Sequence, residues 1–246
     1  MRYLIKFSYD GTNYNGYQKQ IGYNSIEESI EKALTFINNK KETKLNSSGR
    51  TDKGVHAINQ AGHFDLDVEI SLDKLKRAIN SNIPSDIHIN SVEVKNDDFH
   101  ARYNVVEKTY KYVLNMGEYN PLERLYVYQL NQKLNVENMI EAIKDFIGEH
   151  DFSSFTPERD KKNNCIRTIY NATIEYDKEN KDKLIFTFTG NGFIKYQIRN
   201  MIGYLIWVGL GKKDKNSIKD VLLEKNRRYA TITAHPEGLY LVDVKY

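Results

Sequence analysis

The chain opens on an alternation of apolar and polar positions, which is typical of a strand with one buried face. Tyr3, Ile5, Phe7 and Tyr9 share one face of this strand, opposite Lys6. The alternation stops at a turn rich in glycine, asparagine and tyrosine. We therefore predict that a strand occupies the first ten residues and ends where the turn begins.

The rest of the first half alternates between the helical and the extended period. Ser25 and Glu28 have the spacing of a capping box, and apolar residues then recur at helical spacing up to Ile37. Ser71 is placed to cap a second helix, which ends before Pro84. The predicted elements of this half are a strand over 1–10, a helix over 26–37, a strand and turn over 47–65, a helix over 71–79 and a strand over 86–95.

The second half repeats this plan, with Gly148 as the expected stop of its first helix. Its predicted elements are a strand over 109–115, a helix over 135–147, strands over 166–177 and 184–189, helices over 196–210 and from 217, and a strand over 239–244. Two such halves bury helices against an antiparallel sheet, which is an α+β fold. We place them at 1–103 and 104–246, and a cleft between two halves is a common place for a site.

Amino-acid composition excludes some classes of protein but does not identify the function. The chain has 246 residues, of which 40% are hydrophobic, and a net charge of +3, so an RNA partner is allowed but not required. It has no apolar run long enough to cross a membrane and no signal-peptide pattern at its start. Its one cysteine, Cys165, fits a reducing compartment. We therefore expect a cytoplasmic protein.

The common cofactor and metal motifs are not supported. Gly49 and Gly54 have the spacing of a phosphate-binding loop, but Val55 and His56 stand where lysine and a hydroxyl residue are required. The histidines do not form a metalloprotease pair, and one cysteine cannot supply a thiolate-rich zinc site. We therefore expect neither a cofactor nor a metal ion.

The stretch 47–57 reads SSGRTDKGVHA, with Asp52 between two glycines and two residues after Arg50. Glycine permits tight turns and close approaches of the backbone, so this loop could present a reactive carboxylate to a ligand. Taken alone, however, Asp52 is most simply a turn residue, because aspartate is favoured in turns. By the same standard Arg50 is a solvated side chain and His56 a structural one.

The whole string closely resembles the signature loop of the A family of tRNA pseudouridine synthases, which reads GRTD, then alanine or lysine, then GVHA. Further blocks resemble that family in order along nearly the whole chain. They are YDGTNYNGYQ over 9–18, FHAR over 99–102, KTYKY over 108–112, HDFSSF over 150–155, QIRNM within 193–203 and PEGLYL over 236–241. One departure is His235, where the family usually has proline.

The resemblance implies two related α+β halves with a joined central antiparallel sheet and the active cleft between the halves. It implies a homodimer that isomerises uridine to pseudouridine in the anticodon stem-loop of tRNA, with nucleotides 38–40 as the family expectation. The reaction breaks the bond from C1′ to N1 and joins C5 to C1′ instead. Since nothing is oxidised and no group is imported, no redox cofactor or nucleotide is needed.

The resemblance also assigns roles to four residues. Asp52 matches the catalytic aspartate, and Arg199 matches the arginine that pairs with it. Tyr110 matches the tyrosine that stacks on the target uracil, and Arg50 matches the arginine that holds or replaces the flipped nucleotide. Other basic residues are expected to meet tRNA phosphates, among them Arg102, Lys108, Lys111, Arg227 and Arg228.

Two other functions stay open at this point. A non-catalytic RNA-binding module of similar fold would bind RNA through aromatic residues on its sheet, but it has no need of Asp52. A carboxylate-based glycosidase acting on nucleosides would normally need a second carboxylate, and the loop offers no obvious one.

Overall fold

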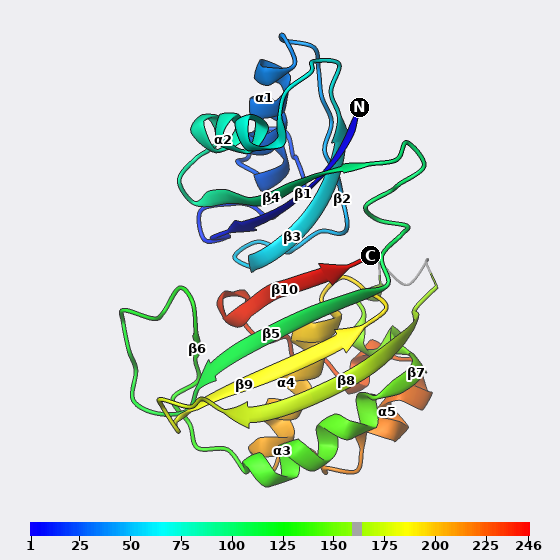
Figure 1. Cartoon of the computed structure of the whole chain (residues 1–246). Helices are drawn as coiled ribbons and strands as arrows, with labels where there is room; N and C mark the ends of the chain where they lie inside the picture. Colours follow the sequence, from blue (N-terminus) through cyan, green and yellow to red (C-terminus); the bar gives the residue numbers. More distant parts are fainter. Residues whose placement is uncertain (159–163) are drawn as a thin grey trace. The chain divides into compact units, whose positions relative to one another are not determined.

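The computed structural model describes residues 1–158 and 164–246, which form two compact units (Figure 1). The first unit contains residues 1–106 together with 240–246, and the second contains residues 107–239. The chain therefore leaves the first unit, builds the second, and returns to the first with its last seven residues.

The sheet of the first unit has the strand order β4-β1-β3-β10. β1 pairs antiparallel with both β3 and β4, whereas β10 pairs parallel with β3. The short β2 pairs with the far end of β3, where Asn46 lies opposite His63. The strands are β1 (Arg2–Tyr9), β2 (Asn46–Ser47), β3 (His56–Asp65), β4 (Ile87–Lys95) and β10 (Leu239–Lys245).

Two helices cover this sheet, α1 (Ile26–Ile37) and α2 (Leu72–Asn82), on the same side of β1, β3 and β4 in Figure 1. The Ser25 hydroxyl accepts a hydrogen bond from the Glu28 N–H at 3.3 Å, so α1 begins at the predicted cap. The apolar faces of the helices meet those of the strands in the core. Its fully buried members include Ile5, Phe7, Ile30, Leu34, Leu75 and Ile79.

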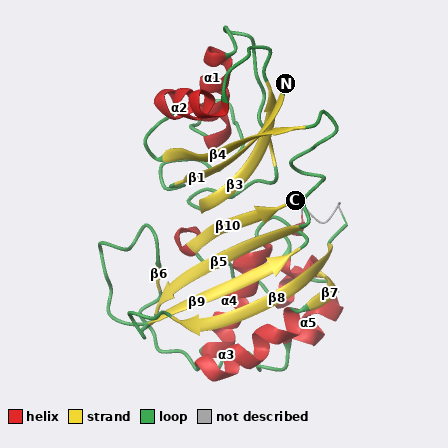
Figure 2. Ribbon diagram, viewed as in Figure 1, coloured by secondary structure: helices red, strands yellow, loops and turns green. Residues whose placement is uncertain are grey.

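The second unit has an antiparallel sheet in the order β5-β9-β8-β7, with α4 behind the strands in Figure 2. Its strands are β5 (Glu107–Asn115), β6 (Tyr128–Gln129), β7 (Gly148–Asp151), β8 (Ile166–Tyr176) and β9 (Lys183–Gly190), with β6 pairing parallel to the end of β5. Its helices are α3 (Val136–Ala142), α4 (Gln197–Gly209) and α5 (Ile218–Glu224). The described residues of this unit also include four short 3₁₀ segments, which are Ile143–Phe146, Phe152–Phe155, Arg227–Tyr229 and Pro236–Gly238.

The helix α4 is the centre of the second unit's core. Nearly all of its residues are buried, and an aromatic cluster surrounds it, with Phe155 edge-on to Tyr204 at 6.0 Å between ring centroids. Phe186 and Phe188 of β9 are fully buried as well. This core fixes the first turn of α4, on which Arg199 lies.

The predicted α+β class, with helices packed on mostly antiparallel strands, is confirmed. The helix predicted over 135–147 is shorter, because α3 ends at Ala142 and a 3₁₀ segment continues to Phe146. The short strands β6 and β7 were not predicted. The units also differ from the predicted halves 1–103 and 104–246, because β10 pairs with β3 of the first unit. No helix within residues 1–158 or 164–246 is long and apolar enough to span a bilayer.

Candidate functional site

Asp52 lies in the loop between β2 and β3, at the first position of a tight turn. The Val55 N–H donates to the Asp52 carbonyl at 3.2 Å, which closes a four-residue turn. Gly54 is the third residue of this turn and has a φ of +78°, the conformation that a type II turn requires there. The Asp52 side chain is half-buried. The signature glycine is therefore explained by the turn that begins at Asp52.

The residues before Asp52 are held by a buried glutamine of β3. Gln60 is 0% exposed, and its side-chain oxygen accepts from the Ser48 hydroxyl at 2.6 Å. Its amide group donates to the Gly49 carbonyl at 3.1 Å, while the Ser48 N–H donates to the Ala61 carbonyl at 2.8 Å. The backbone that leads into the aspartate loop is thereby fixed to the sheet.

Thr51, directly before Asp52, is held by two tyrosines from the first residues of the chain. Its hydroxyl lies 2.8 Å from the hydroxyl of Tyr9, and its carbonyl accepts from the Tyr17 N–H at 3.1 Å. Tyr9 is 4% exposed, and burial raises the pKa of its hydroxyl, so it stays protonated at neutral pH. The hydrophobic pattern does not predict these contacts, because it marks Tyr9 only as a core position of the first strand.

Two glycines let the segment after β1 pack directly on the loop. A Cβ on Gly11 would lie 2.0 Å from the Val55 carbonyl oxygen. A Cβ on Gly16, whose φ is +97°, would lie 3.2 Å from the Thr51 carbonyl oxygen. Both glycines belong to the block that resembles the family's start, so their presence follows from this close backbone packing.

His56 closes the loop on its other side. Its ring is 2% exposed, stacks on Tyr240 of β10 at 4.9 Å, and accepts a hydrogen bond at Nδ1 from the Gly11 N–H at 3.1 Å. Asp10 Oδ1 also lies 3.2 Å from Nδ1. These contacts agree with the structural role expected for His56.

Arg50 lies on the same loop with an exposed side chain. Its Nη1 donates to Gln18 Oε1 at 2.6 Å, an exposed contact that a polar ligand can replace. The first unit thus brings Arg50 and Asp52 together on one loop. The other two predicted site residues, Tyr110 and Arg199, belong to the second unit.

Tyr110 lies on β5, opposite Phe188 of β9, and is 8% exposed. The Phe193 ring meets it edge to face, with 5.3 Å between the centroids and 81° between the planes. Phe193 precedes α4 and is half-buried. An aromatic neighbour of this kind restricts the orientation of the tyrosine ring.

Arg199 lies in the first turn of α4 and is fixed by the segment that precedes β10. Its Nε donates to the Ala234 carbonyl at 2.8 Å, and the Ala234 N–H donates to the Arg199 carbonyl at 2.9 Å. Its guanidinium carbon lies 5.1 Å from the centre of the Tyr196 ring, within the range of a cation–π contact. Arg199 is thus an anchored side chain, unlike a mobile surface arginine.

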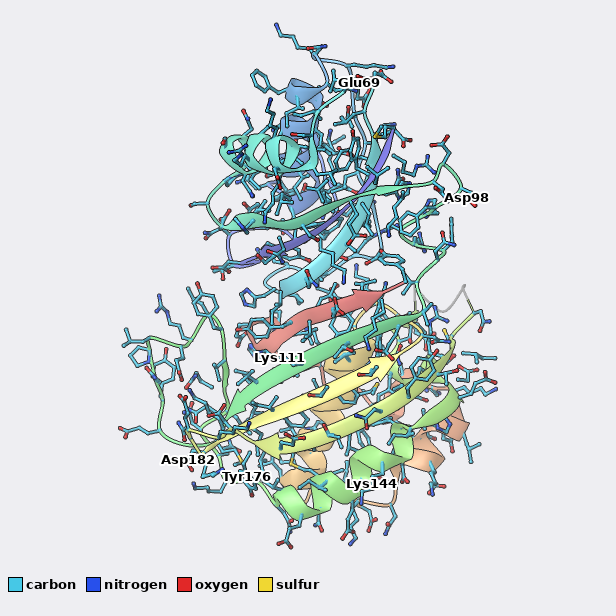
Figure 3. All side chains as sticks on the ribbon, viewed as in Figure 1. Glu69, Asp98, Lys111, Lys144, Tyr176 and Asp182 are labelled. Carbon is cyan, nitrogen blue, oxygen red and sulfur yellow. The ribbon has the colours of Figure 1, made fainter. Side chains whose placement is uncertain are left out.

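The basic residues expected at phosphates fall into two groups. Arg102 and Arg228 are exposed, and Lys108 and Lys111 are half-buried on β5, where Figure 3 labels Lys111. Arg227 instead serves the fold.

The guanidinium of Arg227 is engaged within the second unit. Its Nη2 donates to Asn200 Oδ1 and to the Thr231 carbonyl, both at 3.0 Å, and to the Thr233 hydroxyl at 3.1 Å. Burial lowers the pKa of this arginine. The structure therefore does not support the expected phosphate contact for Arg227.

The described residues contain no group of three or more histidine, cysteine, aspartate or glutamate side chains that could hold a metal ion. What the first unit does offer is a half-buried carboxylate on a loop whose backbone is fixed at several points. The second unit offers a buried tyrosine ring and an anchored guanidinium.

Comparisons with known proteins point to one family. The model of the family "tRNA pseudouridine synthase" matches residues 5–104 and 142–246. A tRNA pseudouridine synthase A of Streptococcus uberis is 44% identical over 246 residues, covering 100% of this chain and 98% of the relative. One from Limosilactobacillus reuteri is 40% identical over 248 residues, covering 100% of this chain and 96% of the relative.

A solved structure titled "Crystal Structure of a Cbf5-Nop10-Gar1 Complex" is 13% identical, with a TM-score of 0.33 over 83% of this chain and 54% of that one. That likeness is too weak to carry an argument. The family match and the full-length relatives are sufficient by themselves. The chain belongs to the tRNA pseudouridine synthase family, whose members are isomerases.

Proposed function

We propose that this pseudouridine synthase acts on uridines 38–40 in the anticodon stem-loop of tRNA and that Asp52 is its catalytic carboxylate. The observation that carries the proposal is the aspartate loop, in which the backbone on both sides of Asp52 is hydrogen-bonded while its side chain remains half-exposed. A fixed backbone is what a group must have to meet a reacting atom at a defined distance.

The chemistry explains why a carboxylate is needed. Breaking the bond from C1′ to N1 places positive character on the ribose, which an ionised carboxylate stabilises, captures as a covalent adduct, or relieves by removing a proton. The freed uracil turns and C5 bonds to C1′. The hydrogen on C5 then leaves, so its release reports the complete reaction.

The ionised form of Asp52 requires a nearby cation. In our proposal Arg199 pairs with Asp52 and holds the pKa of that carboxyl below its usual range. The anchoring of Arg199 Nε by the Ala234 carbonyl supports this role, because it fixes the plane of the guanidinium. Tyr110, held by Phe193, provides the surface on which the target uracil stacks.

A uridine within a stem must be flipped out before it can react, at a cost of a few kcal/mol. We assign Arg50 to this step, since its exposed guanidinium lies on the same loop as Asp52. The Arg50→Ala variant should therefore lose turnover more than affinity for tRNA. Equal losses in both quantities would contradict the assignment.

The central experiment measures release of tritium from C5 of uracil in an unmodified tRNA transcript. The wild type should release it, and Asp52→Asn should bind the same tRNA yet release almost none. Asp67→Asn is the matched control, because Asp67 is an exposed carboxylate of the first unit that pairs with Lys41. Normal release by Asp52→Asn would overturn the catalytic assignment.

The proposed target positions in the tRNA are tested with transcripts in which only one of nucleotides 38, 39 and 40 is a uridine labelled with tritium at C5. Release from each of these, with none from a labelled uridine in another stem, is the expected result. Release that is independent of position would contradict the anticodon stem-loop as the target.

We further propose that the enzyme is a homodimer in the cytoplasm. The family resemblance supports the first statement. A tRNA substrate, together with a single cysteine among 246 residues, supports the second. Sedimentation at twice the mass of one chain is expected, and a monomer at micromolar concentration would contradict the dimer.

A further inference from the structure

The hydroxyl groups of Tyr9 and Thr51 form a contact that the proposed reaction does not yet use. Tyr9 is the last residue of β1, and its ring is packed between two other buried rings, with centroid distances of 6.1 Å to Phe7 and 6.3 Å to Tyr17. The ring therefore has one position, and its hydroxyl marks a fixed point at the end of the strand.

The Tyr9 hydroxyl contacts Thr51, the residue before the proposed catalytic aspartate. The Tyr9 hydroxyl lies 2.8 Å from Thr51 Oγ1, and the peptide that follows Thr51 carries Asp52. The Thr51 carbonyl is held separately by the Tyr17 N–H at 3.1 Å. The side chain of Thr51 is thus held by the last residue of β1, and its backbone by the segment that follows β1.

The turn after Asp52 is tied as well, through the bond from the Val55 N–H to the Asp52 carbonyl. The loop entrance depends on Gln60, which holds Ser48 and Gly49. Between these two anchors, the hydroxyl groups of Tyr9 and Thr51 meet at 2.8 Å, one residue before Asp52. A shift of Thr51 would be passed directly to Asp52, the next residue in the chain.

We propose that Tyr9 and Thr51 are positioning residues, which set the location of the Asp52 carboxylate through their shared hydroxyl contact. The inference rests on the proposed catalytic role of Asp52. Neither hydroxyl is required to touch the substrate. Their loss should lower kcat, because a misplaced carboxylate reacts poorly, and should leave tRNA binding nearly unchanged.

The test removes one hydroxyl at a time. Tyr9→Phe and Thr51→Val should each lower kcat for tritium release by roughly 10- to 100-fold, the cost of a misplacement of about 1 Å, with little change in KM. Thr51→Ser, which keeps the hydroxyl, should retain most of the activity. The double variant Tyr9→Phe/Thr51→Val should be no worse than Tyr9→Phe alone, because Tyr9→Phe already removes the contact that Thr51→Val removes.

A second hydroxyl pair in the chain provides the control. Tyr204 is a fully buried tyrosine whose hydroxyl lies 2.7 Å from the Ser217 hydroxyl, in the second unit. Tyr204→Phe loses a bond of the same kind and of similar length, so a general loss of stability should appear in it as well. It should keep the kcat of the wild type.

Amide hydrogen exchange measures the stability of the loop's hydrogen bonds independently of enzyme activity. In Tyr9→Phe and Thr51→Val, the amides of Tyr17 and Val55 should exchange faster than in the wild type, since one donates to Thr51 and the other to Asp52. The amides of β1 and β3 should keep their rates.

Wild-type kcat in both single variants, or an equal loss of kcat in Tyr204→Phe, would overturn the positioning role. So would additive losses in the double variant. Failure of the wild type to release tritium, or full release by Asp52→Asn, would instead contradict the proposed function itself.

Discussion

Arg199 and Ala234 exchange two hydrogen bonds, one from the guanidinium Nε to the Ala234 carbonyl and one from the Ala234 N–H to the Arg199 carbonyl, at 2.8 and 2.9 Å. The exchange joins the first turn of α4 to the segment before β10, 35 residues later in the chain. An arginine held in this way by Nε keeps the rest of its planar fork in a defined direction.

Arg199→Lys should therefore be a severe change although the charge is kept. A lysine ammonium cannot hold the Ala234 carbonyl and present a second fixed donor, so we expect kcat to fall by about 10²-fold. The control is Arg124→Lys, because Arg124 also donates to a carbonyl, that of Pro121 at 2.8 Å, at an exposed position. Steady-state tritium release measures both. A kcat for Arg199→Lys equal to that of Arg124→Lys would rule out the directional role.

Arg227 and Arg228 are adjacent arginines with different expected roles. Arg227→Gln should destabilise the fold by about 2–3 kcal/mol, the value of hydrogen bonds made by a charged group, because Asn200 and Thr233 each lose one of their partners. Arg228→Gln should leave stability unchanged. It should instead weaken tRNA binding and reduce the salt dependence of log K by about 0.7–0.9. Urea unfolding and filter binding at several salt concentrations separate the two effects, and identical behaviour of the variants would contradict the distinction.

Gly11→Ala should disrupt the packing of the segment after β1 on the aspartate loop. The new Cβ would lie 2.0 Å from the Val55 carbonyl oxygen, so backbone must move, at a cost of about 3 kcal/mol or more. Gly22→Ala is the comparison, because nothing lies within 4 Å there and only its positive φ is strained, at about 1 kcal/mol. Thermal unfolding measures both losses. A smaller loss for Gly11→Ala than for Gly22→Ala would show that the loop adjusts freely.

The stability of the protein should fall as the pH drops from 6.5 to 4. Burial, His100 and Arg2 lower the pKa of His63 to about 4 in the folded state, from 6.5. The unfolded chain therefore binds a proton in this window that the folded chain does not, which lowers the free energy of unfolding by about 2–3 kcal/mol across it. His63→Gln should show a weaker dependence of stability on pH, because it lacks the group that takes up this proton. A residual dependence should remain, because Arg2 lowers the pKa of the Asp65 carboxyl in both proteins. Equal slopes in urea unfolding would contradict this.

Most helices and long strands could be predicted because each has a clear period or cap. Ser25 both has the capping sequence and makes the capping bond to the Glu28 N–H. The end of α3 could not be predicted, because Ile143 and Phe146 continue the apolar spacing while the backbone tightens to a 3₁₀ segment. Gly148, with a φ of +111°, then starts β7.

The site was predicted unevenly for a similar reason. The resemblance pointed to Asp52, Arg50, Tyr110 and Arg199, whose mutual approach remains part of the proposal. The contacts that support the loop could not be predicted. Nothing in the sequence around Tyr9 or Gln60 distinguishes a buried residue that holds a loop from one that only fills the core. The pairing of β1 with β3 brings the Tyr9 hydroxyl to Thr51, and the pairing of β2 with β3 brings the Gln60 amide to Gly49.

The return of the chain to its first unit has a consequence for biosynthesis. Tyr240 and Leu241 of β10 pair with His56 and Ala57, which leave the ribosome more than 180 residues earlier. Until then the edge of β3 next to the aspartate loop has no neighbour from β10, and an open strand edge invites wrong pairing. The sheet beside the aspartate loop can therefore be completed only after the whole second unit has been translated.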